Sequence, residues 1–180
     1  MAVQAVVSGG RRNIKRKGLL HFTQWKQKAV ELLLQDDELM KLLTYHTEDW
    51  NDMPNVSEED RYKLVDTQIY QYSFIDTIAQ EQKSYIGIGM SHYSPDEGFR
   101  RFSNEYISGF MYFYILVDRN IITTNVGCRT DLILGRIYDI FQGCEEFGMG
   151  EIRPESVLER WVDNSTHGGY TIGFKIVEMK

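Results

Sequence analysis

Cysteine and closely spaced histidine are scarce in this sequence. Its 180 residues include only two cysteines, Cys128 and Cys144, which no short metal-ligand spacing joins. The four histidines lie far apart in the chain, at His21, His46, His92 and His167. We therefore expect a reduced compartment, two unpaired thiols, and neither a metal centre nor a cofactor site.

The sequence also lacks the common signatures of enzymes. It contains no phosphate-binding G-x-x-x-x-G-K-[ST], no dinucleotide-binding G-x-G-x-x-G, no zinc-binding H-E-x-x-H and no G-x-S-x-G of serine hydrolases. We predict a protein that is not an enzyme. A metal-dependent nuclease built from scattered carboxylates is a third reading, although these fall in expected loops and helix ends, where solvation is their usual role. They are Asp36, Asp37, Glu38, Glu48, Asp49, Asp52, Glu58, Glu59 and Asp60.

Long apolar runs are missing as well. No stretch approaches the roughly 20 apolar residues that span a bilayer. At the N-terminus a weak apolar stretch precedes the charges, which is the reverse of the order in a secretory signal. The sequence therefore favours a protein without membrane contact, which works in the cytoplasm or in a particle assembled there.

Acidic residues are absent from the first 18 positions, although the whole chain has a formal net charge of −6. The glycines and the lack of a helical apolar stripe predict a flexible basic arm over residues 1–18. This arm suits a contact with nucleic acid phosphates or an acidic neighbouring subunit, against the alternative of a solubilising tail. Its cations are Arg11, Arg12, Lys15, Arg16 and Lys17.

Apolar residues recur at three- and four-residue steps over residues 19–45, which predicts helix. A polar break at Asp36 and Asp37 leaves two alternatives: one long helix, or two short helices of which an aspartate caps the second. The acidic stretch 46–66 has no sustained period. It predicts a surface loop that holds a short helical turn near residues 57–60.

β-Strand character begins at residue 68. Aromatic and β-branched residues predict strands at 68–72, 83–90 and 109–118, and the last, almost wholly apolar, is expected at the centre of a sheet. Polar segments before residue 109 predict a long exposed hairpin. We take four of its residues as candidates for contacts between subunits: Arg100, Arg101, Phe102 and Glu105.

The last third of the chain predicts a helix and further strands. Apolar spacing over residues 126–141 indicates a helix, which Gly143 ends. A short strand is expected to begin at Ile152. Two more strands, 156–163 and 169–178, meet across a turn at residues 164–169.

The order of these elements, without repeated βαβ units, favours an α+β fold. We predict a mainly antiparallel sheet flanked by helices on one face, in a single domain over residues 19–180. Hydrophobic residues make up 42% of the chain, which suffices for one core.

Aromatic residues are concentrated in the predicted sheet and hairpin, with twelve between residues 70 and 114. Alternate residues of a half-exposed strand point away from the core, so that one core can hold only some of these rings. The others either meet another subunit, since tyrosine is enriched in interfaces, or lie under helices on a second covered face.

Several segments share their layout with a known family. The chain opens with helical Val-Glu-Leu-Leu-Leu at residues 30–34 and Leu-Met-Lys-Leu-Leu at 39–43. Its middle contains Tyr-Ile-Gly-Ile-Gly at 85–89 and Tyr-Phe-Tyr-Ile-Leu-Val-Asp at 112–118.

The C-terminal half continues this layout. A helix ends in Ile-Phe-Gln-Gly at residues 140–143, and Gly-Met-Gly at 148–150 precedes a closing Gly-Tyr-Thr-Ile-Gly-Phe at 169–174. Over residues 25–180 the chain resembles the tail terminator and tail completion proteins of tailed bacteriophages, which are found in the neck between the tail tube and the head connector.

The resemblance implies a virion protein of the neck, assembled in the host cytoplasm, with no cofactor and no reaction. Six or so identical subunits would form a ring on the tail tube, stop its growth and offer a second face to the head connector. The tail tube protein and the connector or neck proteins would be its partners. The runner-up is a small nucleic-acid-associated protein that uses the basic arm as a phosphate clamp.

Overall fold

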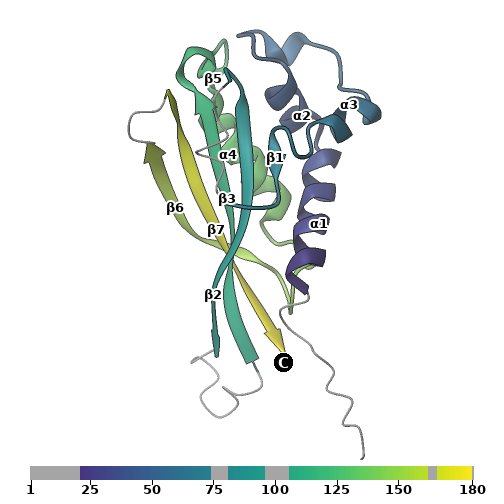
Figure 1. Ribbon diagram of the computed structural model, residues 1–180, viewed down its shortest axis with the longest axis vertical. Helices are drawn as coiled ribbons and strands as arrows, with labels where there is room; N and C mark the ends of the chain where they lie inside the picture. Colours follow the sequence, from purple (N-terminus) through teal and green to yellow (C-terminus); the bar gives the residue numbers. More distant parts are fainter. Residues whose placement is uncertain (1–20, 74–80, 96–105, 162–165, 180) are drawn as a thin grey trace, which may run out of the picture.

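The computed structural model describes residues 21–73, 81–95, 106–161 and 166–179 (Figure 1). The predicted basic arm lies outside these residues, and so does the tip of the predicted hairpin.

Five strands form one sheet in the order β1-β2-β3-β7-β6. The long strands are β2 (Ser84–Pro95), β3 (Tyr106–Asp118) and β7 (His167–Met179); β6 (Arg153–Trp161) and the two-residue β1 (Ile69–Tyr70) form the edges. All neighbours pair antiparallel except β1 and β2. β3 is the middle strand, as its apolar run predicts, and the predicted α+β fold with a mainly antiparallel sheet is confirmed.

β2 is longer than predicted. It continues beyond Met90 to Pro95, with a change of register between Ser91 and Ser94. In this bulge His92 has a φ of +58°. The polar sequence here resembles a loop because the bulge interrupts the alternation of inward and outward residues.

The C-terminal strands also differ from the prediction. The two strands expected after Ile152 are one strand, β6, with a shift of register after Pro154. β7 begins at His167 because Gly168 and Gly169 pair with β3 as strand residues. The assignment of these glycines to the turn was therefore wrong: their small size serves close pairing within the sheet.

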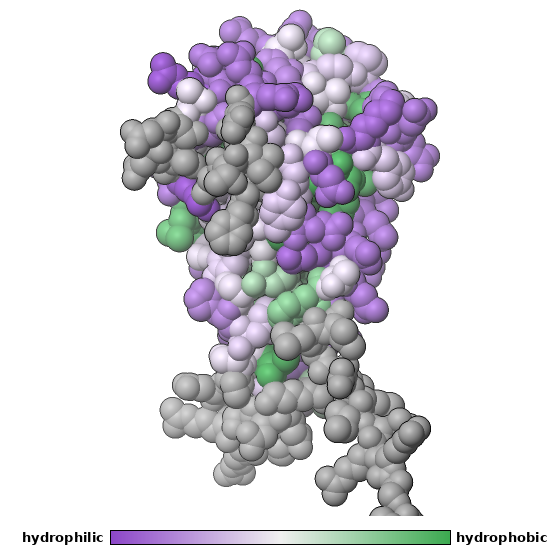
Figure 2. Space-filling view, in the orientation of Figure 1, coloured by the Kyte–Doolittle hydropathy of each residue, from purple (hydrophilic) through white to green (hydrophobic). Residues whose placement is uncertain are grey.

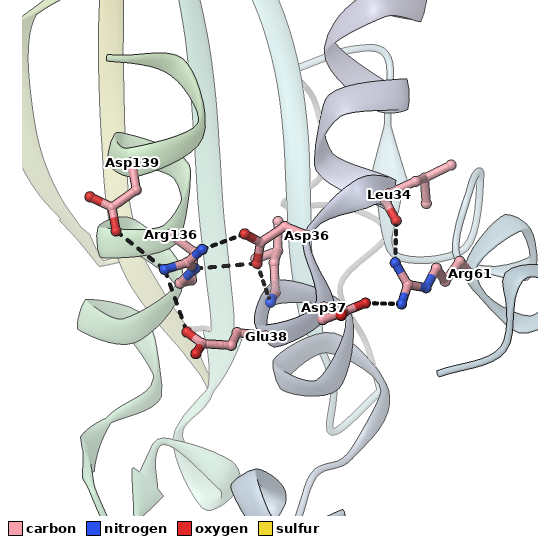
Figure 3. Close-up of polar contacts among 8 residues, drawn as sticks. Leu34, Asp36, Asp37, Glu38, Arg61, Arg136 and Asp139 are labelled. Atoms are coloured by element: carbon pink, nitrogen blue, oxygen red, sulfur yellow. Dashed lines mark hydrogen bonds and ion pairs between the residues drawn. The ribbon is translucent and has the colours of Figure 1, made fainter. Parts of the chain in front are cut away.

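Residues 21–44 form two helices, α1 (His21–Gln35) and α2 (Asp37–Thr44), so the two-helix alternative is correct. Asp36 caps α2, because its side chain accepts a hydrogen bond of 2.7 Å from the backbone N–H of Leu39. It also pairs with Arg136, with 2.5 Å between Nη2 and Oδ2, which fixes the junction of α1 and α2 to α4 (Arg129–Phe141; Figure 3).

The acidic loop after α2 contains a 3-10 helix, η1 (Trp50–Asp52), and the short α3 (Glu58–Lys63). The hydroxyl of Ser57 caps α3 by accepting a hydrogen bond of 3.2 Å from the backbone N–H of Asp60. This confirms the helical turn expected in that region.

The connection from β3 to α4 is compact. It consists of a 3-10 helix, η3 (Arg119–Ile121), and a two-stranded hairpin of β4 (Thr123–Thr124) and β5 (Gly127–Cys128). α4 ends at Phe141, shortly before Gly143, whose φ of +76° is of the left-handed kind that glycine favours.

The described helices cover one face of the sheet. α4 packs on β3 and β7, and α2 packs on β2; α4 lies behind the strands in Figure 1. Alternate residues of β2, β3 and β7 point into this layer and are fully buried with the apolar sides of the helices. They are Ile86, Ile88, Met111, Phe113, Ile115, Val117, Ile172, Phe174 and Ile176.

One arginine is fully buried where α4 begins. Arg129 is 0% exposed and donates hydrogen bonds to four backbone carbonyls. Its Nη1 binds Leu42 and Tyr45 at 2.9 and 2.8 Å, its Nη2 binds Thr47 at 2.7 Å, and its Nε binds Ile121 at 2.8 Å. Three of these carbonyls belong to the end of α2 and the turn after it, where the helix dipole favours a cation. Arg129 therefore holds α4 to α2 and η3.

Candidate interaction surface

The second face of the sheet has no helix of the described chain on it. The strand residues that alternate with the core residues point to this side, and the pairing of strands aligns them in rows. Six tyrosine and phenylalanine side chains gather here, and we call their surface the aromatic face. They are Tyr70, Tyr72, Tyr85, Phe110, Tyr112 and Tyr114.

Two tyrosine rings of this face lie against glycines of the neighbouring strands. A Cβ atom at Gly173 of β7 would lie 2.6 Å from the ring of Tyr112, and one at Gly89 of β2 would lie 2.8 Å from the ring of Tyr114. The rings occupy the space that side chains would otherwise take. The centroids of the Phe110, Tyr112 and Tyr114 rings are spaced by 5.7 and 6.1 Å, which produces a low and continuous aromatic surface along β3.

One end of the aromatic face closes into a small second core. Tyr70, Tyr85 and Leu116 are 6%, 3% and 1% exposed, and Tyr114 packs against them. The Tyr70 hydroxyl donates a hydrogen bond of 2.8 Å to the carbonyl of Thr67. Burial raises the pKa of both tyrosines, so they stay neutral.

The rest of the aromatic face remains partly accessible. Tyr72 is 42% exposed, and Phe110 and Tyr112 are half-buried. In Figure 2, pale to green surface lies in the lower middle of the molecule, between mostly purple, hydrophilic surface on both sides. This contrast is typical of a surface that binds another protein.

Charged side chains surround the rings. The guanidinium of Arg160 lies over Tyr114, 5.5 Å from the ring centroid. Lys175 of β7 pairs with Glu155 at 3.8 Å. A tyrosine-rich centre within a rim of opposite charges has the composition of a protein–protein interface.

β6 adds an apolar edge to this surface. Leu158 is 63% exposed, whereas Val157, 48% exposed, pairs with the core residue Ile172 and lies on the other side of the strand. Leu158 pairs with Thr171, on the same side of the sheet as the aromatic face. An edge strand with exposed apolar side chains offers a place for another chain to pack, while Pro154 removes one backbone donor from it.

Comparison with known proteins identifies the family. A family model described as YomW matches residues 36–176, which is most of the chain. The chain belongs to the YomW family. This family is phage-related, so the relation to phages expected from the sequence is confirmed at this coarser level, and the tail terminator assignment stays a prediction. No curated protein matches the chain significantly.

A buried polar cluster joins three strand ends in this YomW chain. Asp118 and His167 are 3% and 2% exposed. His167 Nε2 lies 3.0 Å from the carbonyl of Glu81, and the Thr166 hydroxyl donates to Asp118 at 2.9 Å. Burial alone would raise the pKa of Asp118, but hydrogen bonds from Asn120 and Thr166 outweigh it and lower the pKa. The cluster fixes the ends of β2, β3 and β7 to one another.

The contact residues that the sequence predicts for this YomW chain lie outside the described residues. The strands that flank the predicted hairpin tip are described, and Pro95 pairs with Ile107. The residues concerned are Arg11, Arg12, Lys15, Arg16 and Lys17 of the arm, and Arg100, Arg101, Phe102 and Glu105 of the hairpin.

The described acidic and histidine side chains do not converge on one point. Among the residues that the structure describes, no three His, Cys, Asp or Glu side chains could hold a metal ion together. Two of the predicted carboxylates, Asp36 and Asp37, pair with Arg136 and Arg61, and a third, Asp60, pairs with a lysine.

None of the described helices is long and apolar enough to cross a membrane.

Sequence reasoning missed the tyrosine–glycine pairing of the aromatic face. The signal was present: Gly87 and Gly89 occupy alternate positions of one strand, and Tyr112 and Tyr114 occupy alternate positions of the next. Glycine weakens a strand interior because it loses more conformational freedom on folding. Repeated glycines in one strand, opposite aromatic residues of the next strand, therefore indicate aromatic rings that lie across the backbone of the glycine-containing strand.

Proposed function

We propose that this chain is a structural protein of a phage particle that acts in the neck. Six or so copies form a ring that ends the tail tube and joins it to the head connector. The protein acts by assembly, without a reaction or a cofactor: the packing of subunits stops tube growth, and the other side of the ring receives the connector. It is a component of the virion, and the ring forms in the host cytoplasm.

The aromatic face is the observation that carries this proposal. Its tyrosines provide large contact area at low conformational cost, because each has only two side-chain torsions to fix. Its centre contains no aspartate or glutamate among the described residues, and the charges of Lys175 and Glu155 lie at its border. Membership of a phage-related family supports the proposal that this surface acts in the assembly of a phage particle.

The size of the sheet limits the area that this interface can have. β3 and β7 each contain 13 residues, which at about 3.3 Å per residue span about 40 Å. Five strands about 4.8 Å apart add a width of about 20 Å. The product, roughly 800 Å², equals what one partner contributes to a standard interface. It is an upper bound for this face, because β1 contains only two residues and Tyr70, Tyr85 and Leu116 at one end are already buried.

A ring needs one heterologous contact that is repeated around an axis. In such a contact, the aromatic face and β6 of one copy would pack on a different surface of the next copy. Closure of the ring would cover Leu158, which a lone copy leaves 63% exposed. Full burial of an exposed leucine contributes about 1.5–3 kcal/mol. Leu158 would gain at most the part of this that its exposed 63% represents, and the loss of that gain should weaken every contact of the ring.

Two matched pairs of variants test the proposal. Leu158→Asp and Tyr112→Ala alter the aromatic face and its edge, whereas Val126→Asp and Tyr138→Ala alter exposed residues near and on α4. Each full chain is mixed with growing tail tubes, and tube length and end-bound rings are measured by negative-stain microscopy.

We expect the wild type and both controls to cap the tubes, and the two face variants to leave tubes uncapped. Circular dichroism and thermal unfolding are measured for every variant to establish that it is folded. A folded Leu158→Asp chain that caps tubes as well as the wild type would overturn the role of this face. A wild type that ignores tubes and binds DNA in a salt-dependent manner would favour the nucleic-acid reading instead.

A further inference from the structure

A pocket of about 560 Å³ lies between the C-terminal end of α1 and α3. Its floor is apolar, and its walls are polar and aromatic. Its lining residues are Glu31, Leu34, Gln35, Val56, Glu58, Arg61 and Tyr62. The pocket lies on the helical side of the molecule and takes no part in the aromatic face.

The cation of this pocket is already neutralised. Arg61 pairs with Asp37 and donates two further hydrogen bonds to backbone carbonyls, at 2.9 Å to Leu34 and at 3.0 Å to Val56. Figure 3 shows its guanidinium between Leu34 and Asp37. The remaining charges of the lining are therefore negative.

Glu31 and Glu58 provide this negative charge. Both are exposed, and neither forms an ion pair within the described part of the chain. Tyr62, 60% exposed, adds an aromatic ring, and Leu34 and Val56 add apolar surface. Two carboxylates, one ring and an apolar floor suit the long side chain of arginine or lysine, whose stem packs while its charge is paired.

The chain itself supplies a segment of the required chemistry. Residues 1–18 contain five cations and no acid, whereas the rest of the chain has 15 basic and 26 acidic residues, a net charge of −11. The five cations fall within residues 11–17. A basic segment and an acidic body of one chain attract each other, most strongly at low salt.

The reach of the segment favours contact between copies. Glu31 lies ten residues into α1, about 15 Å from its start. Lys15, Arg16 and Lys17 precede His21 by four to six residues, which span at most about 13–20 Å before the chain reverses. Because a turn uses about four residues, little of this span is left to run back along α1, so these three cations are placed better for a neighbouring copy than for their own pocket. Arg11 and Arg12 precede His21 by ten and nine residues and have enough chain to reach either pocket.

We infer that the α1–α3 pocket binds residues 11–17 of a second copy of this chain. The inference rests on the proposed ring, in which each copy would offer its pocket to one neighbour and its basic segment to the other. Each of these contacts joins two different surfaces of neighbouring copies, so it can repeat around the ring beside the contact made by the aromatic face.

Peptide binding tests the pocket independently of ring formation. A fluorescent peptide of residues 9–20 is titrated onto the full chain with its own five arm cations changed to glutamate. We expect saturable binding that weakens with salt. Glu31→Lys with Glu58→Lys should weaken it about tenfold, whereas the charge-matched control Glu48→Lys with Asp52→Lys should change it less than about twofold. Equal binding to both double variants would overturn the inference.

Mixing of variants distinguishes a neighbour's segment from the chain's own. Two variants are mixed: an arm-reversed chain, whose five arm cations are changed to glutamate, and a pocket-reversed chain, with Glu31→Lys and Glu58→Lys. Each variant alone should fail to associate. The mixture should associate, because opposite charges then meet at every contact. If association returns only in a chain that carries both reversals, and not in the mixture, the arm binds the pocket of its own copy and the inference is overturned. If the wild type forms no ring and the peptide still binds the pocket, the proposed function fails and the pocket assignment is supported. A ring that forms while the peptide does not bind supports the proposed function and overturns this inference.

Discussion

Arg129→Lys is expected to destabilise the protein although it retains the positive charge. Arg129 uses three nitrogen atoms to bind four carbonyls on α2, the following turn and η3. A single ammonium group cannot reach both sides of this arrangement, so about two buried carbonyls would lose their donor. A buried polar group without a partner costs about 1–3 kcal/mol, and for two such groups we expect the free energy of unfolding to fall by about 2–6 kcal/mol.

Urea denaturation followed by circular dichroism measures this loss from the midpoint and the slope. Arg153→Lys is the matched control, because the Arg153 side chain is 74% exposed; its effect should stay within about 0.5 kcal/mol. If Arg129→Lys unfolded within about 0.5 kcal/mol of the wild type at an unchanged slope, Arg129 would not hold the two helices together as described.

Four further substitutions test other parts of the structure. Gly173→Ala should cost about 1–3 kcal/mol in urea denaturation, because its Cβ would lie 2.6 Å from the Tyr112 ring, whereas Gly135→Ala, with open space around it in α4, should stabilise by about 0.5–1 kcal/mol. Asp36→Ala removes a helix cap and an ion pair, and its thermal unfolding should show a loss of about 1–2 kcal/mol; no loss would contradict the cap. Burial, aided by two nearby cations, lowers the pKa of His46. The unfolded chain then binds this proton at a higher pH than the native chain, so stability should fall below about pH 6.5, and His46→Gln should make that decline shallower.

Local patterns predicted much of the fold. The polar break in the first helical segment and the cap at Asp36 depend on neighbouring residues alone, and both were accessible from the sequence. The central place of β3 followed from its apolar run. The start of β7 was predicted too late because Gly168 and Gly169 are read as turn residues unless the neighbouring strand is known.

Long-range contacts explain what the sequence did not reveal. Arg129 binds carbonyls 82 to 87 positions earlier in the chain, and no local pattern marks an arginine as fully buried. The crowding of aromatic residues predicted that some would leave the core, but not which face stays without helices. That depends on the side of the sheet to which α4 returns after β3, which periodicity alone does not fix.

The mass of the full chain in solution tests the proposed ring most directly. Light scattering after size exclusion should give about six times the 21.1 kDa of one chain for the wild type, with annular particles in negative-stain images. Leu158→Asp should shift the mass towards that of one chain, and Val126→Asp should not. A wild type that remains at 21.1 kDa, both alone and in the presence of tail tubes, would contradict the account.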